Sequence, residues 1–354
     1  MNNQNTRQHG GSDAGLPIQY DFSTNSNALG PCPHVLELIQ ASDCAHYPDP
    51  EYHALRHQLA QWHEVDAQRI VIAGSASEFI FRFSLACFFE LQSRGIAAHV
   101  HLPKHGYGDY AAAAHACGLI PTSLPQQAQL IWACEPSSPL GQAHENLAQL
   151  IAAQANHAAQ AIVLDCAYQP LRLSGKPSLN AEQRDQVWQL YSPNKALGLT
   201  GIRGAYAIAP SEKKSNISSY FLKLRLQQLA ASWPVGAHAH TMLSAWTEPE
   251  TQAWLAQSLL SLAYWKAQQI QVCEHLGWRV LSSDANFFCV FPYDQHSSKK
   301  LSNYSTELAQ YLRLHGIKVR TTDSFGLAHH FRLGVRSPEA QAALLHAVQL
   351  FAIV

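Results

Sequence analysis

A lysine in a glycine-rich loop is the residue of this sequence best suited to covalent chemistry. Lys195 lies in the pattern SxxKxxGLxGxR, which runs from Ser192 to Arg203 and follows an apolar stretch. A lysine amine forms a Schiff base with an aldehyde, and it then acts as a nucleophile or as a proton carrier. Because a single loop lysine is usually only solvated, the pattern indicates a reactive site only if other polar residues converge on it.

Other polar residues do follow apolar runs. Asp165 and Tyr168 close the segment AIVLDCAY, and Asp165 precedes Lys195 by thirty residues. The small residues Ser75, Ala76 and Ser77 stand between an apolar run and the start of a predicted helix. Small residues let the backbone approach an anion, and the free N–H groups at a helix start attract phosphate. These segments predict a site that holds a phosphate group near Lys195.

The elements that position these residues follow from the alternation of apolar runs with helical stretches. Strands are predicted at 70–73, 100–102, 130–133, 161–164, 186–191 and 205–209, with a helix over about 77–92. Strands separated by helices indicate an α/β sheet with largely parallel strands. In such sheets the ligand lies beyond the strand ends, which is where Ser75, Asp165 and Lys195 are expected.

The C-terminal part of the chain predicts a second, smaller α+β domain. A helical region over about 216–274 is broken near Trp233-Pro234, and strands are expected at 278–281, 286–291, 317–320 and 331–335. Helices are expected over about 306–315 and from Pro338 onward. We predict an N-terminal arm with part of the small domain at 1–46, a large domain at 47–235 and the small C-terminal domain at 236–354.

Composition excludes several classes of protein. The 354 residues carry a formal net charge of −1, so neither nucleic acid nor an anionic membrane is expected as a partner. No apolar run is long enough for a membrane span, and the first residues lack an apolar signal core, which predicts a cytoplasmic protein. The eight cysteines are spread without a CxxC pattern, and the 20 histidines lack metal-site spacing. We therefore expect reduced thiols and no metal.

The lysine pattern resembles the cofactor-binding signature of the fold-type I pyridoxal-phosphate (PLP) enzymes, the aspartate aminotransferase superfamily. The resemblance implies a large domain with a mixed, mostly parallel sheet flanked by helices, and PLP bound through Lys195. It implies that Asp165 contacts the pyridine nitrogen and that Tyr168 contacts the ring hydroxyl. The residues it assigns to the cofactor phosphate are Ser75, Ala76, Ser77, Ser192 and Arg203.

Three further positions match the superfamily, and a fourth departs from it. An aromatic residue stacks on the cofactor ring there, and Tyr107 matches best, with Tyr110 as the second candidate. In Glu135-Pro136-Ser137-Ser138-Pro139-Leu140-Gly141, Ser138 replaces the asparagine that usually donates to the ring oxygen. Tyr47 matches a tyrosine that crosses to the partner's cofactor phosphate, which implies a homodimer with shared active sites. Arg332 matches the arginine that binds the substrate carboxylate.

Several segments are similar to one branch, the threonine-phosphate decarboxylases of cobalamin biosynthesis, which are related to the histidinol-phosphate aminotransferases. These segments are His9-Gly10-Gly11, residues 21–31, Trp233-Pro234-Val235 and residues 283–287. The resemblance implies a lyase that decarboxylates L-threonine O-3-phosphate to aminopropanol phosphate. The substrate-binding candidates are His9, Asn27, Arg320 and Arg332. The substrate phosphate needs its own cation, and Arg320 and His9 are the candidates for that role.

Two alternatives remain open from the sequence. One is a histidinol-phosphate-type or other class I/II aminotransferase, because the same residues serve decarboxylation and transamination. The other is a non-enzymatic descendant of the fold. Ser138 is its only support, and the intact Lys195, Asp165 and Arg203 argue against it.

Overall fold

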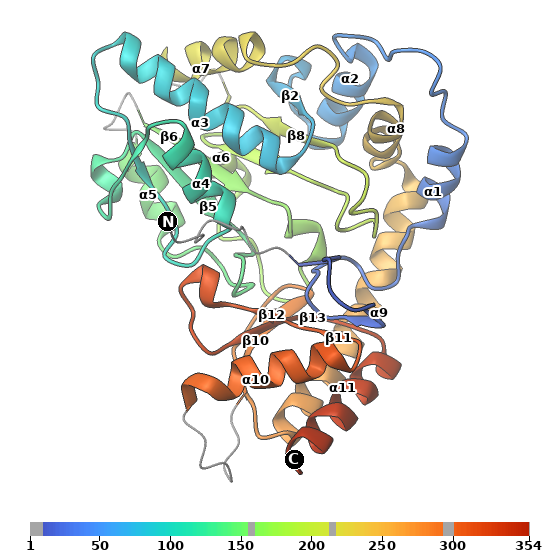
Figure 1. Ribbon diagram of the computed structural model, residues 1–354. Helices are drawn as coiled ribbons and strands as arrows, with labels where there is room; N and C mark the ends of the chain where they lie inside the picture. Colours follow the sequence, from blue (N-terminus) through green and yellow to red (C-terminus); the bar gives the residue numbers. More distant parts are fainter. Residues whose placement is uncertain (1–9, 155–159, 212–216, 293–300, 354) are drawn as a thin grey trace.

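The molecule consists of two packed regions, an upper one and a lower one in Figure 1. The computed structural model describes residues 10–154, 160–211, 217–292 and 301–353. The upper region is built around a seven-stranded sheet, and the lower one around a four-stranded sheet. The domain boundaries given above stay a prediction.

The seven-stranded sheet confirms the predicted α/β class. Its order is β2-β8-β7-β6-β5-β3-β4, and every strand runs parallel to the others except β8, which is antiparallel to both β2 and β7. Its strands are β2 (Ile70–Ala73), β3 (His99–His101), β4 (Ile120–Pro121), β5 (Leu130–Cys134), β6 (Ala161–Asp165), β7 (Trp188–Tyr191) and β8 (Ala205–Ile208). Because β5 to β7 are parallel neighbours, the residues after them meet at one edge of the sheet.

Helices cover both faces of this sheet. The helices of the upper region are α1 (Pro33–Gln40), α2 (His53–His63), α3 (Ala76–Ser93), α4 (Gly108–Ala116), α5 (Leu147–Gln154), α6 (Ala181–Arg184), α7 (Ile217–Gln228) and α8 (Ala237–Ala245). Short 3-10 turns lie at η1 (Ala67–Arg69), η2 (Pro125–Gln127) and η3 (Gln169–Leu171). One core forms where α3 packs on the sheet, with the Phe83 ring 5.9 Å from Trp132 and 5.2 Å from Trp188.

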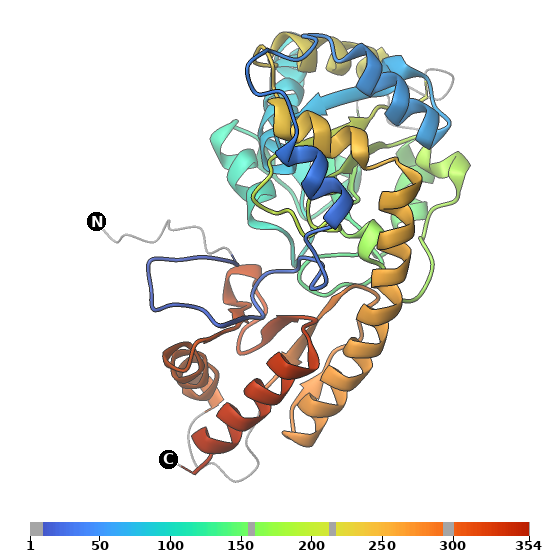
Figure 2. The same ribbon diagram turned by 90° about the vertical axis from the view of Figure 1, so that its right-hand side faces the viewer.

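The lower region contains an antiparallel sheet in the order β12-β13-β10-β9. Its strands are β9 (Arg279–Val280), β10 (Phe287–Phe291), β12 (Arg320–Thr321) and β13 (Phe331–Gly334), and the turn η4 (Asp323–Phe325) connects β12 to β13. Helices α10 (Leu301–Leu314) and α11 (Pro338–Phe351) pack beside it. The long helix α9 (Pro249–His275) runs from the upper region to the lower one, as the orange helix of Figure 2 shows.

The N-terminal arm differs from expectation at one point. The sequence shows no strong pattern over the first thirty residues, yet β1 (Tyr20–Asp21) pairs in parallel with β11 (Ile317–Lys318). Arg336 fixes the arm further by donating hydrogen bonds to the carbonyl oxygens of Asp21 and Thr24. This anchoring places residues 23–25 beside the lower sheet.

Three other observations bear on the composition arguments. All eight cysteines have free thiols. In the described part of the chain, no three His, Cys, Asp or Glu side chains gather in a way that would hold a metal ion. No helix among the described residues has the length and apolar content needed to cross a membrane.

Candidate active site

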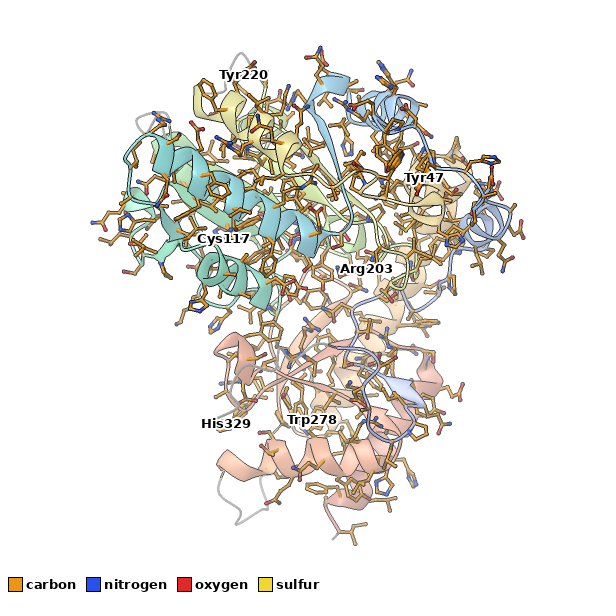
Figure 3. All side chains as sticks on the ribbon, turned by 45° about the horizontal axis from the view of Figure 1, so that its top comes forward. Tyr47, Cys117, Arg203, Tyr220, Trp278 and His329 are labelled. Carbon is orange, nitrogen blue, oxygen red and sulfur yellow. The ribbon has the colours of Figure 1, made fainter. Side chains whose placement is uncertain are left out.

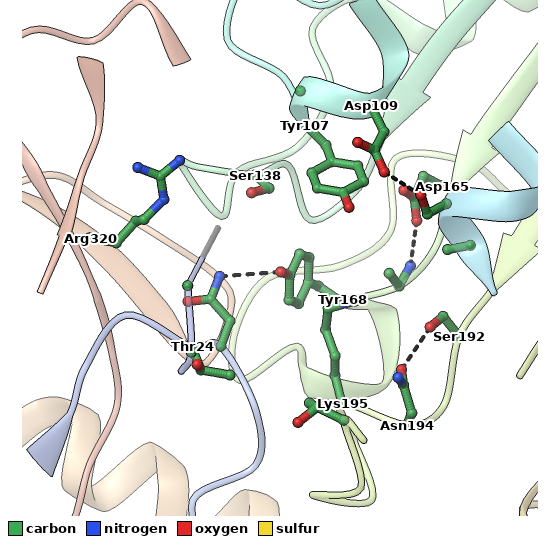
Figure 4. Close-up of a pocket in the computed structure, with 18 of the residues that line it drawn as sticks. Thr24, Tyr107, Asp109, Ser138, Asp165, Tyr168, Ser192, Asn194, Lys195 and Arg320 are labelled. Carbon is green, nitrogen blue, oxygen red and sulfur yellow. Dashed lines mark hydrogen bonds between the residues drawn. The ribbon is translucent and has the colours of Figure 1, made fainter. Parts of the chain in front are cut away.

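A cavity of about 570 Å³ lies between the two sheets, and Figure 4 shows many of the side chains that line it. Its wall combines residues that follow β3, β5, β6 and β7 with residues of β12, η4 and β13. Eleven of the predicted site residues meet there: Ala76, Ser77, Tyr107, Ser138, Asp165, Tyr168, Ser192, Lys195, Arg203, Arg320 and Arg332. Segments far apart in the sequence therefore converge on Lys195.

The start of α3 forms the part of the cavity wall predicted to hold a phosphate. Ser75 does not line the cavity, because its side chain caps the helix and accepts a hydrogen bond from the backbone N–H of Glu78 at 3.0 Å. Ser77 donates its hydroxyl to the buried carboxylate of Asp109 at 2.5 Å. Asp109 itself lines the cavity and was missed by the sequence reasoning, although it stands two residues after Tyr107.

Asp165 is a buried carboxylate at the end of β6. One of its oxygens accepts a 2.6 Å hydrogen bond from the Tyr110 hydroxyl, and the other accepts a 2.9 Å bond from the backbone N–H of Ala167. Burial raises the pKa of Asp165, and the hydrogen bond from Tyr110 opposes that rise. Since both donors are neutral, a nearby cation would stabilise the ionised form.

The two candidate aromatic residues have different surroundings. Tyr110 is 1% exposed and stacks on Trp132 with ring centroids 5.1 Å apart. Its hydroxyl donates a hydrogen bond to Asp165. Tyr107 lines the cavity and meets Tyr110 edge to face at 5.9 Å. Figure 4 shows the Tyr107 ring standing opposite Tyr168. This arrangement favours Tyr107 as the residue that covers a bound ring, while Tyr110 orients the carboxylate.

Lys195 lies in a tightly packed loop. Its Nζ is 5.3 Å from the centre of the Tyr168 ring, and its carbonyl oxygen accepts hydrogen bonds from the backbone of Asn27 and Gly198. Gly198 has a φ of +69°, and a Cβ atom at this position would come within 2.6 Å of the Gly30 Cα. The loop therefore packs directly on the N-terminal arm, and only glycine fits at the contact.

The rest of the lysine loop adds polar groups to the same side of the cavity. The Ser192 hydroxyl donates to the side-chain oxygen of Asn194 at 2.8 Å, and the Asn194 amide donates to the Ile202 carbonyl at 3.3 Å. Arg203 is exposed and also lines the cavity. Asn194 was missed by the sequence reasoning, although it lies inside the lysine pattern.

Arg320 and Arg332 lie directly opposite each other on the antiparallel strands β12 and β13. One Arg332 nitrogen donates to the Ser138 hydroxyl at 3.1 Å and another donates to the Ser23 carbonyl at 3.0 Å, while the buried Nε has no hydrogen-bond partner. Arg320 donates to the Ser324 hydroxyl at 2.7 Å. Burial, followed by the charge of Arg332, lowers the pKa of Arg320 to about 10.

The arm brings a different asparagine to the cavity from the predicted one. Asn27 does not line the cavity, because its amide donates to the Ala196 carbonyl at 3.0 Å and to the Ser258 hydroxyl at 2.8 Å. Asn25 does line it, and its amide donates to the Tyr168 hydroxyl at 3.3 Å. The Oδ1 atom of Asn25 is buried without a hydrogen-bond partner. Both asparagines belong to one motif, and only the packing decides between them.

His9 and Tyr47 are the two remaining predicted residues. His9 falls outside the described residues. Tyr47 does not line the cavity of its own chain; it is 78% exposed and stacks on Trp233 with ring centroids 4.3 Å apart. Figure 3 shows it on the outside of the molecule. An exposed aromatic pair of this kind is available to a second copy of the chain.

The donor set of the cavity fits pyridoxal phosphate. Lys195 supplies an amine, and Asp165 supplies a buried carboxylate whose protein partners are neutral. Burial raises the pKa of this carboxylate and the charge of Lys195 lowers it, and a protonated ring nitrogen would add a cation in direct contact with it. The start of α3 and Arg203 provide N–H groups and a positive charge for a phosphate. No residue of this set conflicts with the cofactor that the sequence implies.

Comparison with known proteins shows which family the chain resembles. The family model described as aminotransferase class I and II matches residues 112–348. The chain is 25% identical, over 357 residues, to a histidinol-phosphate aminotransferase of Jannaschia sp., covering 94% of this chain and 91% of that relative. It is also 25% identical to histidinol-phosphate aminotransferase 2 of Psychrobacter arcticus, covering 93% of this chain and 88% of the relative.

Solved structures with the same fold include enzymes of both predicted branches. The histidinol-phosphate aminotransferase of Sinorhizobium meliloti, in complex with pyridoxal-5'-phosphate, has a TM-score of 0.75 at 20% identity and covers 94% of this chain and 92% of its own. The L-threonine-O-3-phosphate decarboxylase of Porphyromonas gingivalis has a TM-score of 0.73 at 19% identity, covering 94% and 99%. At these identities the likeness concerns the fold.

Proposed function

The chain belongs to the class I and II aminotransferase family, and from that membership we propose that it decarboxylates L-threonine O-3-phosphate to (R)-1-aminopropan-2-yl phosphate. Its cofactor is pyridoxal 5'-phosphate. The observation that carries the choice of substrate is the placement of Arg320 opposite Arg332 in the cavity that also holds Lys195. Such a pair suits a short ligand with two anionic groups.

Arg320 and Arg332 are held close together by the pairing of their strands. Opposed residues on antiparallel strands have Cα atoms roughly 4.5–5.5 Å apart. Besides burial, the charge of Arg332 lowers the pKa of Arg320, so the two guanidinium groups repel each other, and an anionic ligand that touches both would offset this repulsion. Threonine phosphate carries its carboxylate and its phosphate only a few bonds apart. We assign the carboxylate to Arg332 and the phosphate to Arg320.

In the proposed reaction, each residue around the cofactor has a separate role. Bound PLP supplies an electron sink for the bond that breaks at the substrate Cα. Asp165 holds a proton at the pyridine nitrogen, Tyr107 covers the ring face, and Tyr168 with Asn25 lies near the ring hydroxyl. Arg332 orients the carboxylate so that the bond between Cα and the carboxyl carbon breaks and CO2 leaves. Lys195 then delivers a proton to Cα, which completes the amine product.

A second candidate is supported by the names of the relatives. Both curated relatives reported above are histidinol-phosphate aminotransferases. Histidinol phosphate carries one phosphate and an imidazole but no carboxylate, so only one of the two arginines would face an anion of that substrate. The keto acid that accepts the amino group would have to supply the anion for the second arginine. For this reason we rank aminotransfer below decarboxylation.

The two functions are separated by their products. Purified protein loaded with PLP is incubated with threonine phosphate alone, and separately with histidinol phosphate and 2-oxoglutarate. Decarboxylation predicts one CO2 for each substrate consumed, without any keto acid. Aminotransfer from histidinol phosphate without CO2 release from threonine phosphate would overturn the proposal and establish the second candidate.

Lys195 is tested independently of the substrate. Borohydride reduction of the yellow protein should fix the cofactor on the peptide that contains Lys195, and Lys195→Ala should remove this labelling. Lys266, which is 8% exposed and does not line the cavity, provides the matched control. Labelling that persists in Lys195→Ala, or that is lost in Lys266→Met, would contradict the assignment.

We further propose that the protein is a homodimer in which Tyr47 reaches the partner's cofactor phosphate. Support comes from the exposed Tyr47–Trp233 pair and from two-fold pairing being the commonest assembly. If sites are shared, an inactive Lys195→Ala chain mixed with an impaired Tyr47→Ala chain forms heterodimers with one complete site. At equal mixing, about a quarter of the wild-type activity should return. A fully active monomer in sedimentation, or mixing without recovery despite chain exchange, would contradict this proposal.

A further inference from the structure

Phe325 is an aromatic residue whose ring contacts both Arg320 and Arg332. It closes the turn η4, lines the cavity and is 8% exposed. We propose that Phe325 is a specificity-determining residue: its ring fixes the spacing of the Arg320 and Arg332 guanidinium groups, so that the cavity selects ligands by the distance between their two anionic groups. The inference rests on the proposed function only in that both place a doubly anionic ligand between these arginines.

The two guanidinium groups contact the same aromatic ring. The Arg320 Cζ lies 4.8 Å from the centre of the Phe325 ring, and the Arg332 Cζ lies 5.5 Å from it. An aromatic face attracts a cation, and the attraction strengthens where water is excluded. A ring with two cations on it therefore holds both charges at set positions. It also offsets part of their mutual repulsion before a ligand arrives.

The turn that carries the ring is held on both sides of the cavity. The Phe325 carbonyl forms a 2.8 Å hydrogen bond with Nδ1 of His105, which belongs to the loop between β3 and Tyr107. The Phe325 N–H donates to the Thr322 carbonyl at 2.9 Å, and the Arg320 guanidinium donates to the Ser324 hydroxyl. The ring is thus connected to the upper region as well as to the lower sheet. The turn is therefore tied to Arg320 through Ser324 and to the upper region through His105.

This arrangement predicts selection by length. When the ring keeps the guanidinium groups at one separation, a ligand whose anions are too close or too far apart loses one of the two contacts. Removing the ring lets the long arginine side chains adjust to several lengths. Without the ring, dianions of different length should bind with more similar affinities, and the best-fitting dianion should bind more weakly.

The experiment measures binding rather than turnover. The PLP-loaded protein is titrated calorimetrically with malonate, succinate, glutarate and adipate, which differ only in the distance between two carboxylates. The variants are Phe325→Leu and Phe325→Met, which remove the ring but keep an apolar side chain, and Phe325→Tyr, which keeps the ring. Phe291→Leu is the matched control, because Phe291 also faces an arginine, with the Arg279 Cζ at 5.4 Å, but does not line the cavity.

The wild type, Phe325→Tyr and Phe291→Leu should prefer one length. Phe325→Leu and Phe325→Met should weaken that optimum roughly threefold to thirtyfold and flatten the series. Unchanged selectivity in both ring-free variants, equal loss in Phe291→Leu, or a wild type without a preferred length would overturn the inference. The circular dichroism melting curve confirms that each variant is folded. Because no carboxylate of the series is decarboxylated, this outcome is independent of CO2 release, so the failure of the proposed function would be recognised separately.

Discussion

Arg172 and two arginines of the cavity, Arg320 and Arg332, are all largely buried, but they have different neighbours. Arg172 forms ion pairs with Glu135 at 2.9 Å and with Asp284 at 3.3 Å, and we call these three residues the paired cluster. Arg320 and Arg332, which we call the cavity pair, are 5% and 6% exposed. Among the described residues, Arg332 has no carboxylate within ion-pair distance; its donors go to a hydroxyl and a carbonyl oxygen.

The difference separates arginines used for folding from arginines suited to a ligand. In the paired cluster, Arg172 joins the loop after β5 to the segment that precedes β10, and its charge is neutralised there. Neutral acceptors leave the positive charge of Arg332 uncompensated, and an anion that enters the cavity would neutralise it. Burial alone therefore does not indicate the role of an arginine; the charge of its partners does.

The largest effect on stability is expected from Arg172→Ala. This change leaves the Glu135 carboxylate, which is 3% exposed, buried without its cation. The free energy of unfolding should fall by about 3–5 kcal/mol. Urea denaturation measures the loss. Arg332→Ala is the matched comparison and should cost much less, because it removes a cation that lacks a carboxylate partner. Equal losses in the free energy of unfolding for the two variants would contradict the distinction between the paired cluster and the cavity pair.

The cavity pair should govern affinity instead. Arg320→Ala should weaken binding of threonine phosphate roughly thirtyfold or more, with a much smaller effect on threonine, because only the phosphate loses its cation. Arg332→Ala should weaken both ligands, since both carry the carboxylate. Arg172→Lys, which keeps a charge in the paired cluster, serves as a control for both ligands. If Arg320→Ala weakens both ligands equally, this arginine does not bind the phosphate.

The smallest effect concerns Lys266, which lies beside the paired cluster and donates to the Ser283 carbonyl. Burial lowers the pKa of Lys266 from 10.5 to about 8, against the opposing charge of Asp284. Between these values the unfolded chain still binds the proton that the folded chain has released. The free energy of unfolding should therefore rise with pH from about 8 to 10.5.

Urea denaturation of wild type and Lys266→Met across this range measures the contribution of this one lysine. The variant should lack that part of the rise and should gain stability below pH 8, where the buried charge is present in the wild type. Parallel pH profiles for the two proteins would show that Lys266 keeps an ordinary pKa.

On the side of the seven-stranded sheet, the sequence alone determined which residues line the cavity together. Asp165 ends β6 and Tyr168 follows it, while Lys195 follows the parallel neighbour β7. Alternation and local spacing were therefore enough to predict that the three residues lie close together. The same reasoning predicted the α/β class and the start of α3. Parallel neighbours bring their ends to one edge, and this rule needs no knowledge of side-chain packing.

Only the tertiary structure decided which residues complete the site from elsewhere. It brought Asn25 rather than Asn27 to the cavity, separated Tyr107 from the buried Tyr110, and connected Ser138 to Arg332. The positions of the two asparagines and of Ser138 depend on contacts between segments more than a hundred residues apart. The roles of Tyr107 and Tyr110 depend on which of the two rings is buried. A one-residue shift in a strand reverses the direction of every side chain. Local sequence does not contain that information, and long-range packing supplies it.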